Sequence, residues 1–240
     1  MKFAASDHLK DLSRRDIKVL MAIERGMYNK RRVDIDTISR ISSISTDKLS
    51  FHLSRLNKFK MCEFWKGANS GYSLTVHGYD ALALDWLFDH KHIQSIGRRI
   101  GVGKESQLFF ALDFEGVEKV IKVHRVGLTS FVHIKKSRDY SIKGSQVNYI
   151  TASASSAKRE FIMLRRLHEL NLSSPVPYVI NRHCIIMELI VGVDLFRLTD
   201  HPDPENLLDK IIEFMHQMFV QLELVHSDLS EHNIMISARW

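Results

Sequence analysis

The chain has 240 residues, 45% of them apolar and 26% charged, which is the composition of a folded chain and excludes general disorder. No run approaches the roughly 18 consecutive apolar residues that span a bilayer, and the first ten residues are polar. We therefore expect an intracellular protein without a membrane partner. The two cysteines, Cys62 and Cys184, lack metal-ligand spacing, which argues against a structural zinc site.

Positive charge is concentrated in the first two thirds of the chain, within a net charge of +6. Residues 1–157 carry 26 Lys and Arg against 16 Asp and Glu, whereas residues 158–240 carry 8 against 12. This bias favours an anionic partner for the first part, either nucleic acid or the phosphates of a nucleotide. Ordinary charging of a solvated surface is the alternative.

Residues 11–60 have the apolar periodicity of three short helices. The first is predicted to end near Gly26, and the third to begin at residues 45–47, whose Ser, Thr and Asp are N-cap residues. The apolar positions are Ile17, Leu20, Met21 and Ile23 in the first helix, Ile35, Ile38 and Ile41 in the second, and Leu49, Leu53, Leu56 and Phe59 in the third.

A β-hairpin and a fourth helix are predicted to follow. Residues 62–66 and 72–75 are β-prone and are separated by Gly-Ala-Asn-Ser-Gly, which has the composition of a turn. A helical pattern then covers about 76–90. Three helices followed by a hairpin is the winged-helix order, so we predict a winged-helix domain over residues 1–92.

The third helix of a winged helix normally enters the major groove of DNA or docks on folded RNA. Its polar positions here are Lys48, His52, Arg55 and Lys58, which are the candidate RNA contacts. A solvated face, or a surface that docks protein, is the alternative for the same residues.

The second domain is predicted over residues 93–240. It begins with strands at 108–114 and 117–124, which are separated by a Glu-Gly turn. A polar segment of about 126–156 has no sustained period and is predicted to be a long mobile loop. A helix from Ala157, a strand over 183–189 and a helix over 204–222 follow.

The strongest chemical motif is His226-x-Asp228-x-x-x-x-Asn233, which has the spacing of a kinase catalytic loop. In that chemistry the aspartate faces the attacking hydroxyl, and the asparagine reaches back to hold Mg²⁺ on the phosphates. The motif is short, so its weight depends on the residues that accompany it.

Four accompanying features occur in the order that kinases have. Glycines in the segment 101–106 would let backbone N–H groups approach phosphate, although the segment is neither a Walker P-loop nor a complete kinase glycine loop. Lys122 ends a β-prone run, Glu160 on the next helix is a candidate ion-pair partner, and a strand ends at Met187 and Glu188. A simple hairpin turn or a surface lysine would explain each feature alone, but not the order of all five.

With these motifs the sequence resembles the RIO-type atypical serine/threonine kinases, and within them the second subfamily, which carries an N-terminal winged helix. The resemblance covers nearly the whole chain. The matching stretches are residues 78–84, 101–106, 122–131, 138–140, 181–183, 187–190 and 225–236.

The resemblance implies an α+β chain, with a winged helix followed by a bilobal kinase-like domain, ATP and Mg²⁺ as cofactors, and ATPase or protein kinase activity in maturation of the small ribosomal subunit. It implies partners in the precursor particle and its rRNA, and a cytoplasmic location with passage through the nucleus. Asp228 and Lys122 would be catalytic and Asn233 a metal ligand. The ATP-binding residues would be Gly101, Val102, Gly103, Lys104, Ser106, Lys122, Glu160, Met187, Glu188 and Ile190.

One departure from the family pattern affects catalysis. Family members continue to an Ile-Asp-[Phe/Trp]-Pro-Gln segment whose Asp binds Mg²⁺, whereas no Asp or Glu follows Glu231 in these 240 residues. We therefore expect an incomplete C-lobe, and ATP binding with weak or absent turnover. Two alternatives stay open: a non-catalytic rRNA-binding factor with a vestigial nucleotide pocket, and a winged-helix transcriptional regulator, which would explain only residues 1–90.

Overall fold

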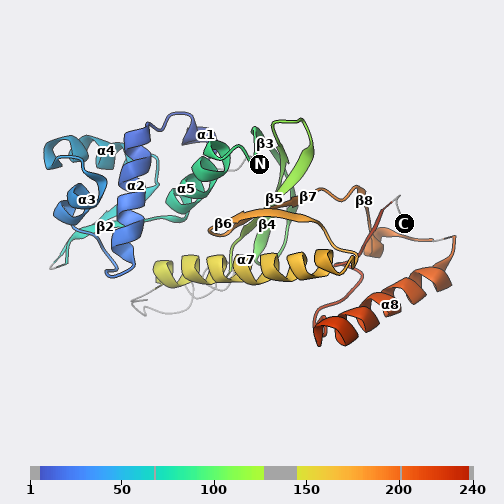
Figure 1. Ribbon diagram of the computed structural model, residues 1–240. Helices are drawn as coiled ribbons and strands as arrows, with labels where there is room; N and C mark the ends of the chain where they lie inside the picture. The colour runs from blue at the N-terminus through green and yellow to red at the C-terminus, as the bar shows by residue number, and fades with distance from the viewer. Residues whose placement is uncertain (1–5, 68, 127–144, 201, 238–240) are drawn as a thin grey trace. The chain divides into compact units, whose positions relative to one another are not determined.

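The structure, a computed structural model, describes residues 6–67, 69–126, 145–200 and 202–237 (Figure 1). By their internal contacts the residues form two compact units, residues 1–159 with 179–186, and residues 160–178 with 187–240. The winged helix and most of a five-stranded sheet belong to the first unit, whereas the first two residues of β6 (Pro177–Asn181) and the last two of β7 (Cys184–Glu188) fall in the second. The domain boundary at residue 92 stays a prediction. No helix in the described ranges is both long enough and apolar enough to cross a membrane.

The first unit begins with the predicted winged helix. A short helix α1 (Ser6–Leu9), which the sequence analysis did not identify, precedes the three expected helices α2 (Arg14–Met27), α3 (Ile35–Ser42) and α4 (Thr46–Lys58). The wing is the antiparallel pair β1 (Cys62–Trp65) and β2 (Gly71–Leu74), followed by α5 (Val76–Asp89).

Local signals at the helix starts explain these boundaries. Ser13 and Asp16 form a capping box at the start of α2, and the Asp34 side chain accepts a hydrogen bond from the Thr37 N–H at the start of α3. Ser45 occupies the cap position of α4 as predicted, but its side chain makes no capping hydrogen bond. The apolar positions at helical spacing form the core between the helices, including the fully buried Leu20, Ile38, Leu49, Leu53 and Leu56.

Helix α5 belongs to two cores. Its Ala81 and Leu82 pack in the winged-helix core, whereas Leu84 and Leu87 pack against the sheet. A helix that is apolar on most of its circumference is buried on most of it, which explains why α5 has no clear polar face. Its first turn approaches the wing so closely that a Cβ on Gly78 would lie 2.1 Å from the Met61 carbonyl oxygen. The helix therefore joins the winged helix to the sheet.

The five-stranded sheet has the order β3-β4-β5-β7-β6. Its strands are β3 (Ser95–Val102), β4 (Ser106–Leu112), β5 (Glu118–His124), β6 (Pro177–Asn181) and β7 (Cys184–Glu188). One face packs on α5 through residues that include Phe109, Ile121, Val123, Cys184 and Ile186. The edge strand β6 was not predicted from the sequence.

The polar segment expected to be a loop over 126–156 is partly helical, so that prediction was wrong for its last twelve residues. Helix α7 (Ser145–Glu169) starts twelve residues before the predicted Ala157. Its early turns are held because Tyr149, Ile150, Ser153 and Ala157, spaced at helical intervals, are buried. The remainder of the predicted mobile loop, residues 127–144, lies outside the described residues.

The second unit contains the end of α7, α8 (Pro204–Leu222) and a small antiparallel pair, β8 (Gly192–Asp194) with β9 (Met235–Ser237). Helix α8 has the predicted bounds, with Asp203 capping it and proline in its first turn. A single 3₁₀ turn, η1 (Leu195–Arg197), follows β8. The segment that carries Asp228 and Asn233 connects α8 to β9.

Candidate active site and candidate RNA-contact surface

The glycine-rich segment forms the turn between β3 and β4. Gly101 and Val102 end β3, and the Gly103 N–H donates to the Ser106 carbonyl oxygen at 2.9 Å. Val102, Gly103 and Lys104 are exposed, so the turn faces solvent. The turn is tied to the sheet at its far end, where the Arg125 N–H donates to the Glu105 carbonyl oxygen at 2.7 Å. An exposed and anchored turn can hold phosphate oxygens.

Lys122 lies beside this turn on one face of the sheet. Gly101, Leu108 and Lys122 are directly opposite one another on β3, β4 and β5. Because side chains alternate along a strand, and Ile121 and Val123 pack toward α5, Lys122 projects from the opposite face. Gly101 contributes no side chain to this row: a Cβ there would lie 3.2 Å from Leu108 Cδ1. Lys122 therefore lies in the same row as Gly101, on the face of the sheet away from α5.

The strand that was expected to form the adenine hinge ends at the predicted residues. Met187 is buried, whereas Glu188 and Ile190 are partly buried. The Glu188 N–H donates to the Val176 carbonyl oxygen at 2.8 Å, and its carboxylate accepts from the Val176 N–H at 3.2 Å. Glu188 thus ties the end of β7 to Val176 through both its backbone and its side chain.

Asp228 and Asn233 are brought together by the turn between them. The Asn233 side-chain amide donates to the Asp228 carbonyl oxygen at 2.6 Å and to its carboxylate at 3.3 Å, and both residues are exposed. The Phe196 N–H donates to the Glu231 carbonyl oxygen at 3.1 Å and the Leu195 N–H to the Ile234 carbonyl oxygen at 2.8 Å, so η1 fixes the position of the turn.

These oxygens suit a hard cation. Mg²⁺ is commonly held by one or two protein oxygen ligands, with waters and substrate phosphates completing its shell. The described residues contain no cluster of three His, Cys, Asp or Glu that could hold a metal by themselves. The Asp228 carboxylate and the Asn233 amide oxygen therefore fit Mg²⁺ that arrives with a nucleotide. Lys122 and Glu160 fall in different units, and their pairing stays a prediction.

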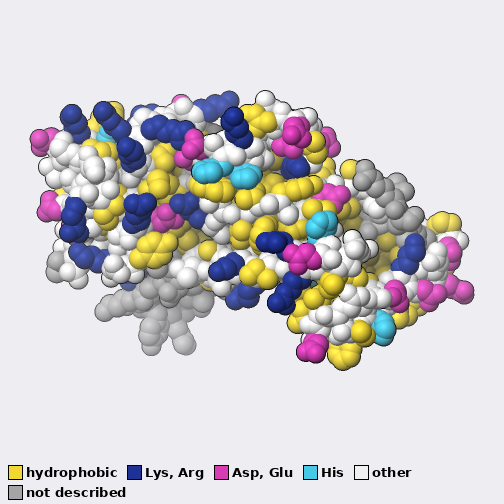
Figure 2. All heavy atoms as spheres, in the orientation of Figure 1, with side chains coloured by type: hydrophobic (Ala, Val, Ile, Leu, Met, Phe, Trp, Pro, Cys, Tyr) yellow, Lys and Arg dark blue, Asp and Glu magenta, His cyan; other side chains and the backbone are white. Residues whose placement is uncertain are grey.

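The candidate RNA contacts on α4 divide into two pairs. Lys48 and Lys58 are exposed, and Figure 2 shows Lys and Arg side chains spread over helices α2–α4. His52 is buried, with its Nδ1 2.8 Å from an Asp16 carboxylate oxygen, so its proposal as an RNA contact was wrong. Arg55 is partly buried and lies 3.4 Å from the same carboxylate. It also donates to the Asp11 carbonyl oxygen.

Asp16 is the reason for this inward arrangement. It is completely buried and also accepts hydrogen bonds from the Ser13 N–H and hydroxyl, at 2.8 and 2.7 Å. Burial opposes its charged form, but the bonds from His52 and Ser13 outweigh burial and lower the pKa of Asp16. His52 and Arg55 thus both stabilise the buried Asp16 carboxylate.

A hollow beside α4 was not anticipated from the sequence. It has a volume of about 490 Å³ and lies between α3, α4 and the wing. The Phe64 and Tyr72 rings are 4.9 Å apart beside it, and the Arg32 guanidinium lies 4.6 Å from the neighbouring Trp65 ring. The signal available in the sequence was the exposed Phe-Trp pair in a short strand. The lining residues are Ile35, Ser50, Leu53, Ser54, Asn57, Lys58, Phe64 and Tyr72.

Comparison with known families accounts for both domains. The RIO domain family matches residues 107–239, and the Rio2 N-terminal family matches residues 9–90. The chain belongs to the RIO kinase family, of the Rio2 type. It is 34% identical over 215 residues to the RIO-type serine/threonine-protein kinase Rio2 of Methanocaldococcus jannaschii, covering 88% of this chain and 78% of that protein.

Two further comparisons support the Rio2 assignment. The Schizosaccharomyces pombe serine/threonine-protein kinase rio2 is 34% identical over 229 residues, which are 95% of this chain and 66% of that protein. The crystal structure of the Chaetomium thermophilum Rio2 kinase in an ADP/Mg²⁺-phosphoaspartate complex superposes with a TM-score of 0.87 at 32% identity, covering 96% of this chain and 68% of that one. The chain spans less than half of the Dictyostelium discoideum rio2 kinase, 44% of its length.

Proposed function

We propose that this chain binds ATP with Mg²⁺ and transfers the γ-phosphoryl group to a serine or threonine hydroxyl, or to water. The observation that carries the proposal is the hydrogen-bonded pair Asp228 and Asn233, held at kinase-loop spacing. Membership of the Rio2 kinases, and a Rio2 relative that was crystallised with ADP and Mg²⁺, support it.

The residues divide the chemistry as follows. Lys122 and the N–H groups of the 101–106 turn bind phosphate oxygens, while the Glu188 carbonyl and the side chains of Met187 and Ile190 receive the adenine. Asp228 accepts the proton of the attacking hydroxyl as its oxygen bonds to phosphorus and the bond to the β-phosphate oxygen breaks. The Asn233 amide oxygen and the Asp228 carboxylate would hold Mg²⁺, which would supply positive charge against the phosphates when bound.

The Asp228 carboxylate and the Asn233 amide oxygen would together supply one negative charge to Mg²⁺. Since charge neutralisation is a large part of phosphoryl-transfer catalysis, these two ligands by themselves are expected to support weak turnover.

Asp228→Asn tests the catalytic assignment. We expect ATP affinity to change little and phosphate release to fall by about 10²–10⁴-fold, or to background if the wild-type rate is low. Asp209→Asn, on the exposed surface of α8, is the matched control and should keep the wild-type rate. Equal phosphate release in the wild type and Asp228→Asn, at a rate above background, would remove Asp228 from the mechanism.

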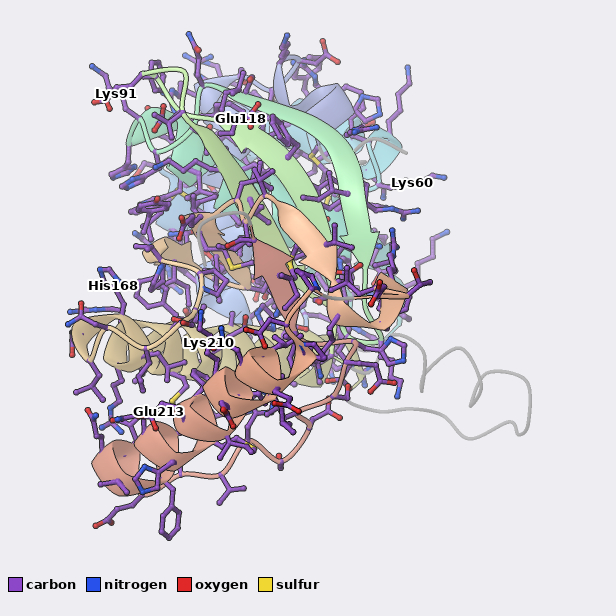
Figure 3. All side chains as sticks on the ribbon, turned by 90° about the vertical axis from the view of Figure 1, so that its right-hand side faces the viewer. Lys60, Lys91, Glu118, His168, Lys210 and Glu213 are labelled. Atoms are coloured by element: carbon purple, nitrogen blue, oxygen red, sulfur yellow. The ribbon has the colours of Figure 1, made fainter. Side chains whose placement is uncertain are left out.

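We also propose that the winged helix contacts rRNA of the small-subunit precursor, in the cytoplasm and with passage through the nucleus. Exposed Lys58, the Phe64 and Tyr72 rings and the Asn57 amide around the hollow combine phosphate-binding, stacking and hydrogen-bonding groups, as RNA-binding surfaces do. Lys60, just beyond α4, also points into solvent (Figure 3). This surface is also what the non-catalytic alternative requires.

The RNA contact is tested with Lys58→Glu and Phe64→Ala. The first should weaken binding to small-subunit rRNA and reduce the salt dependence of the affinity, while the second should weaken binding at every salt concentration. Lys18→Glu, an exposed lysine on α2 away from the hollow, is the control. Unchanged affinity in both test variants would exclude this surface. RNA binding that persists in a chain without ATP turnover would favour the binding factor over the enzyme.

A further inference from the structure

Three family-typical stretches each contain a buried ionisable residue that the mechanism above does not use, and the fold brings these residues together. Residues 78–84, 122–131 and 181–183 each contribute one buried ionisable residue: Asp80 is 1% exposed, Arg125 7% and His183 2%. Burying such groups costs several kcal/mol unless they pair with good geometry. Their pairing shows what the three stretches do.

Asp80 and Arg125 form a two-pronged ion pair. Both terminal nitrogens of the guanidinium donate to Asp80, Nη1 to Oδ1 and Nη2 to Oδ2, each at 2.8 Å. His183 Nε2 lies 2.8 Å from Asp80 Oδ1. Burial opposes ionisation of Asp80, but the Arg125 charge and the His183 bond outweigh burial and lower the pKa of Asp80, so the carboxylate is charged at neutral pH. The planar fork of an arginine fixes direction as well as distance.

The backbone of Arg125 is hydrogen-bonded to the glycine-rich turn, so fixing Arg125 also fixes the turn. Its N–H donates to the Glu105 carbonyl oxygen at 2.7 Å, and Glu105 stands between Lys104 and Ser106. The residues on either side of Arg125 are also held, since the His124 N–H donates to the His183 carbonyl at 2.9 Å and the Val126 N–H to the Ser153 hydroxyl at 3.1 Å. Arg125 is therefore the direct link between α5 of the winged helix and the turn.

Attachment of the winged helix does not require this cluster. Leu84 and Leu87 of α5 already pack in the sheet core. A separate ion pair joins α2 to the β6–β7 turn, where Arg182 Nε and Nη2 each donate to Glu24 at 2.7 Å. Apolar side chains of equal volume would bind the two parts at least as well as a buried ion pair does. The charged cluster adds a fixed position and direction of the Arg125 side chain relative to Asp80 on α5.

We propose that Asp80 is a positioning residue for ATP binding, which acts from the winged helix through Arg125 on the 101–106 turn. This inference rests on the proposed function, since it takes that turn to be the phosphate-binding element. If Asp80 has this role, the affinity for nucleotide depends on the position of α5 against the sheet. A partner that displaces the winged helix would then also displace the turn.

The test compares Asp80→Asn with Glu24→Gln, which removes the other ion pair between the winged helix and the sheet. Three quantities are measured for each: Tm, Kd for Mg²⁺-ATP, and hydrogen exchange of the Arg125 backbone amide. We expect both variants to lose stability. Only Asp80→Asn should weaken ATP binding, by about tenfold, and speed exchange of that amide by about tenfold, while Glu24→Gln should change both less than twofold.

Arg125→Lys keeps the inference testable if Asp80→Asn does not fold, because it retains a cation for Asp80 and removes only the fork. It too should weaken ATP binding with faster exchange at residue 125. Equal ATP affinity in the wild type and these variants, or an equal loss in Glu24→Gln, would overturn the positioning role. A wild-type chain that does not bind ATP would refute the proposed function instead, and unchanged exchange at Arg125 would still show that Asp80 does not hold the turn.

Discussion

Replacing Arg55 with glutamate should destabilise the winged helix, although from the sequence alone this residue belongs to an RNA-contacting surface. Arg55 faces the buried Asp16 carboxylate, so Arg55→Glu would set two carboxylates against each other. Lys58, one turn along the same helix, is exposed beside the hollow. Lys58→Glu makes the same change of charge on the solvent side and is the matched comparison.

The size of the effect follows from the geometry. Unit charges 3.4 Å apart, the distance from Arg55 Nη1 to Asp16 Oδ2, attract by about 5 kcal/mol at an effective dielectric constant of about 20. Because 31% of the Arg55 side chain is exposed, water screens the pair, and we take about 2 kcal/mol for its loss. Repulsion from the new glutamate adds to that figure. A loss of about 2 kcal/mol lowers Tm by about 4–16 °C, the lower end applying if all 240 residues unfold together.

Thermal unfolding followed by circular dichroism measures the difference. We expect Arg55→Glu to melt several degrees below the wild type and Lys58→Glu to stay within about 0.5 kcal/mol of it. Identical melting temperatures for the two variants would refute the inward role of Arg55. The comparison also determines how changes in RNA affinity are interpreted. Lower affinity in Arg55→Glu would result from a destabilised winged helix, whereas lower affinity in Lys58→Glu would result from the loss of a direct contact.

Three further predictions concern the same domain. Gly78→Ala should destabilise the chain by about 3 kcal/mol or more in urea unfolding, because a Cβ would lie 2.1 Å from the Met61 carbonyl oxygen; an unchanged midpoint would mean that the wing and α5 shift freely. Asp34→Ala should cost about 1 kcal/mol by removing the cap on α3, and no loss would show that the Thr37 N–H finds another acceptor. The pKa of Asp16 is lowered in the fold, against burial, by the hydrogen bonds that it accepts, so its stabilisation is present above the unfolded value of about 3.9 and is lost as the pH falls below it. Asp16→Asn should therefore flatten the fall in stability between about pH 4 and pH 2, and a slope as steep as that of the wild type would contradict this origin.

The sequence predicts elements well where the local pattern and the tertiary contacts agree. Helices α2–α5 and α8 and the wing occur where apolar spacing, caps and turn residues place them. The early turns of α7 were missed because their buried positions include Ser153 and Ala157, which do not stand out as an apolar stripe among serines and threonines. Strand β6 was missed because Pro177 and Asn181 at its ends are typical of a loop. Its place at the edge of the sheet is what tolerates the proline.

The arrangement of the site residues could likewise be predicted where the interacting residues are close in sequence, but not where they are far apart. The spacing from Asp228 to Asn233 is short, so one turn of chain determines that the two side chains meet. The inward turn of His52 depends on Asp16, 36 residues earlier, and nothing in the local pattern of α4 reveals that partner. The cluster around Asp80 is more distant still, since its members come from three separate elements that only the folded sheet brings together.

The pairing of β8 with β9 has a consequence for the order in which the chain folds. Residues 192–194 can complete their ladder only when residues 235–237 are available, with the whole of α8 enclosed between them. Closing so long a loop costs conformational entropy before its contacts are gained. During synthesis, the winged helix and the five strands of the sheet can therefore form first. The turn that holds Asp228 acquires its shape only after residues 235–237 have emerged, when the lysine with which it is proposed to work is already in place.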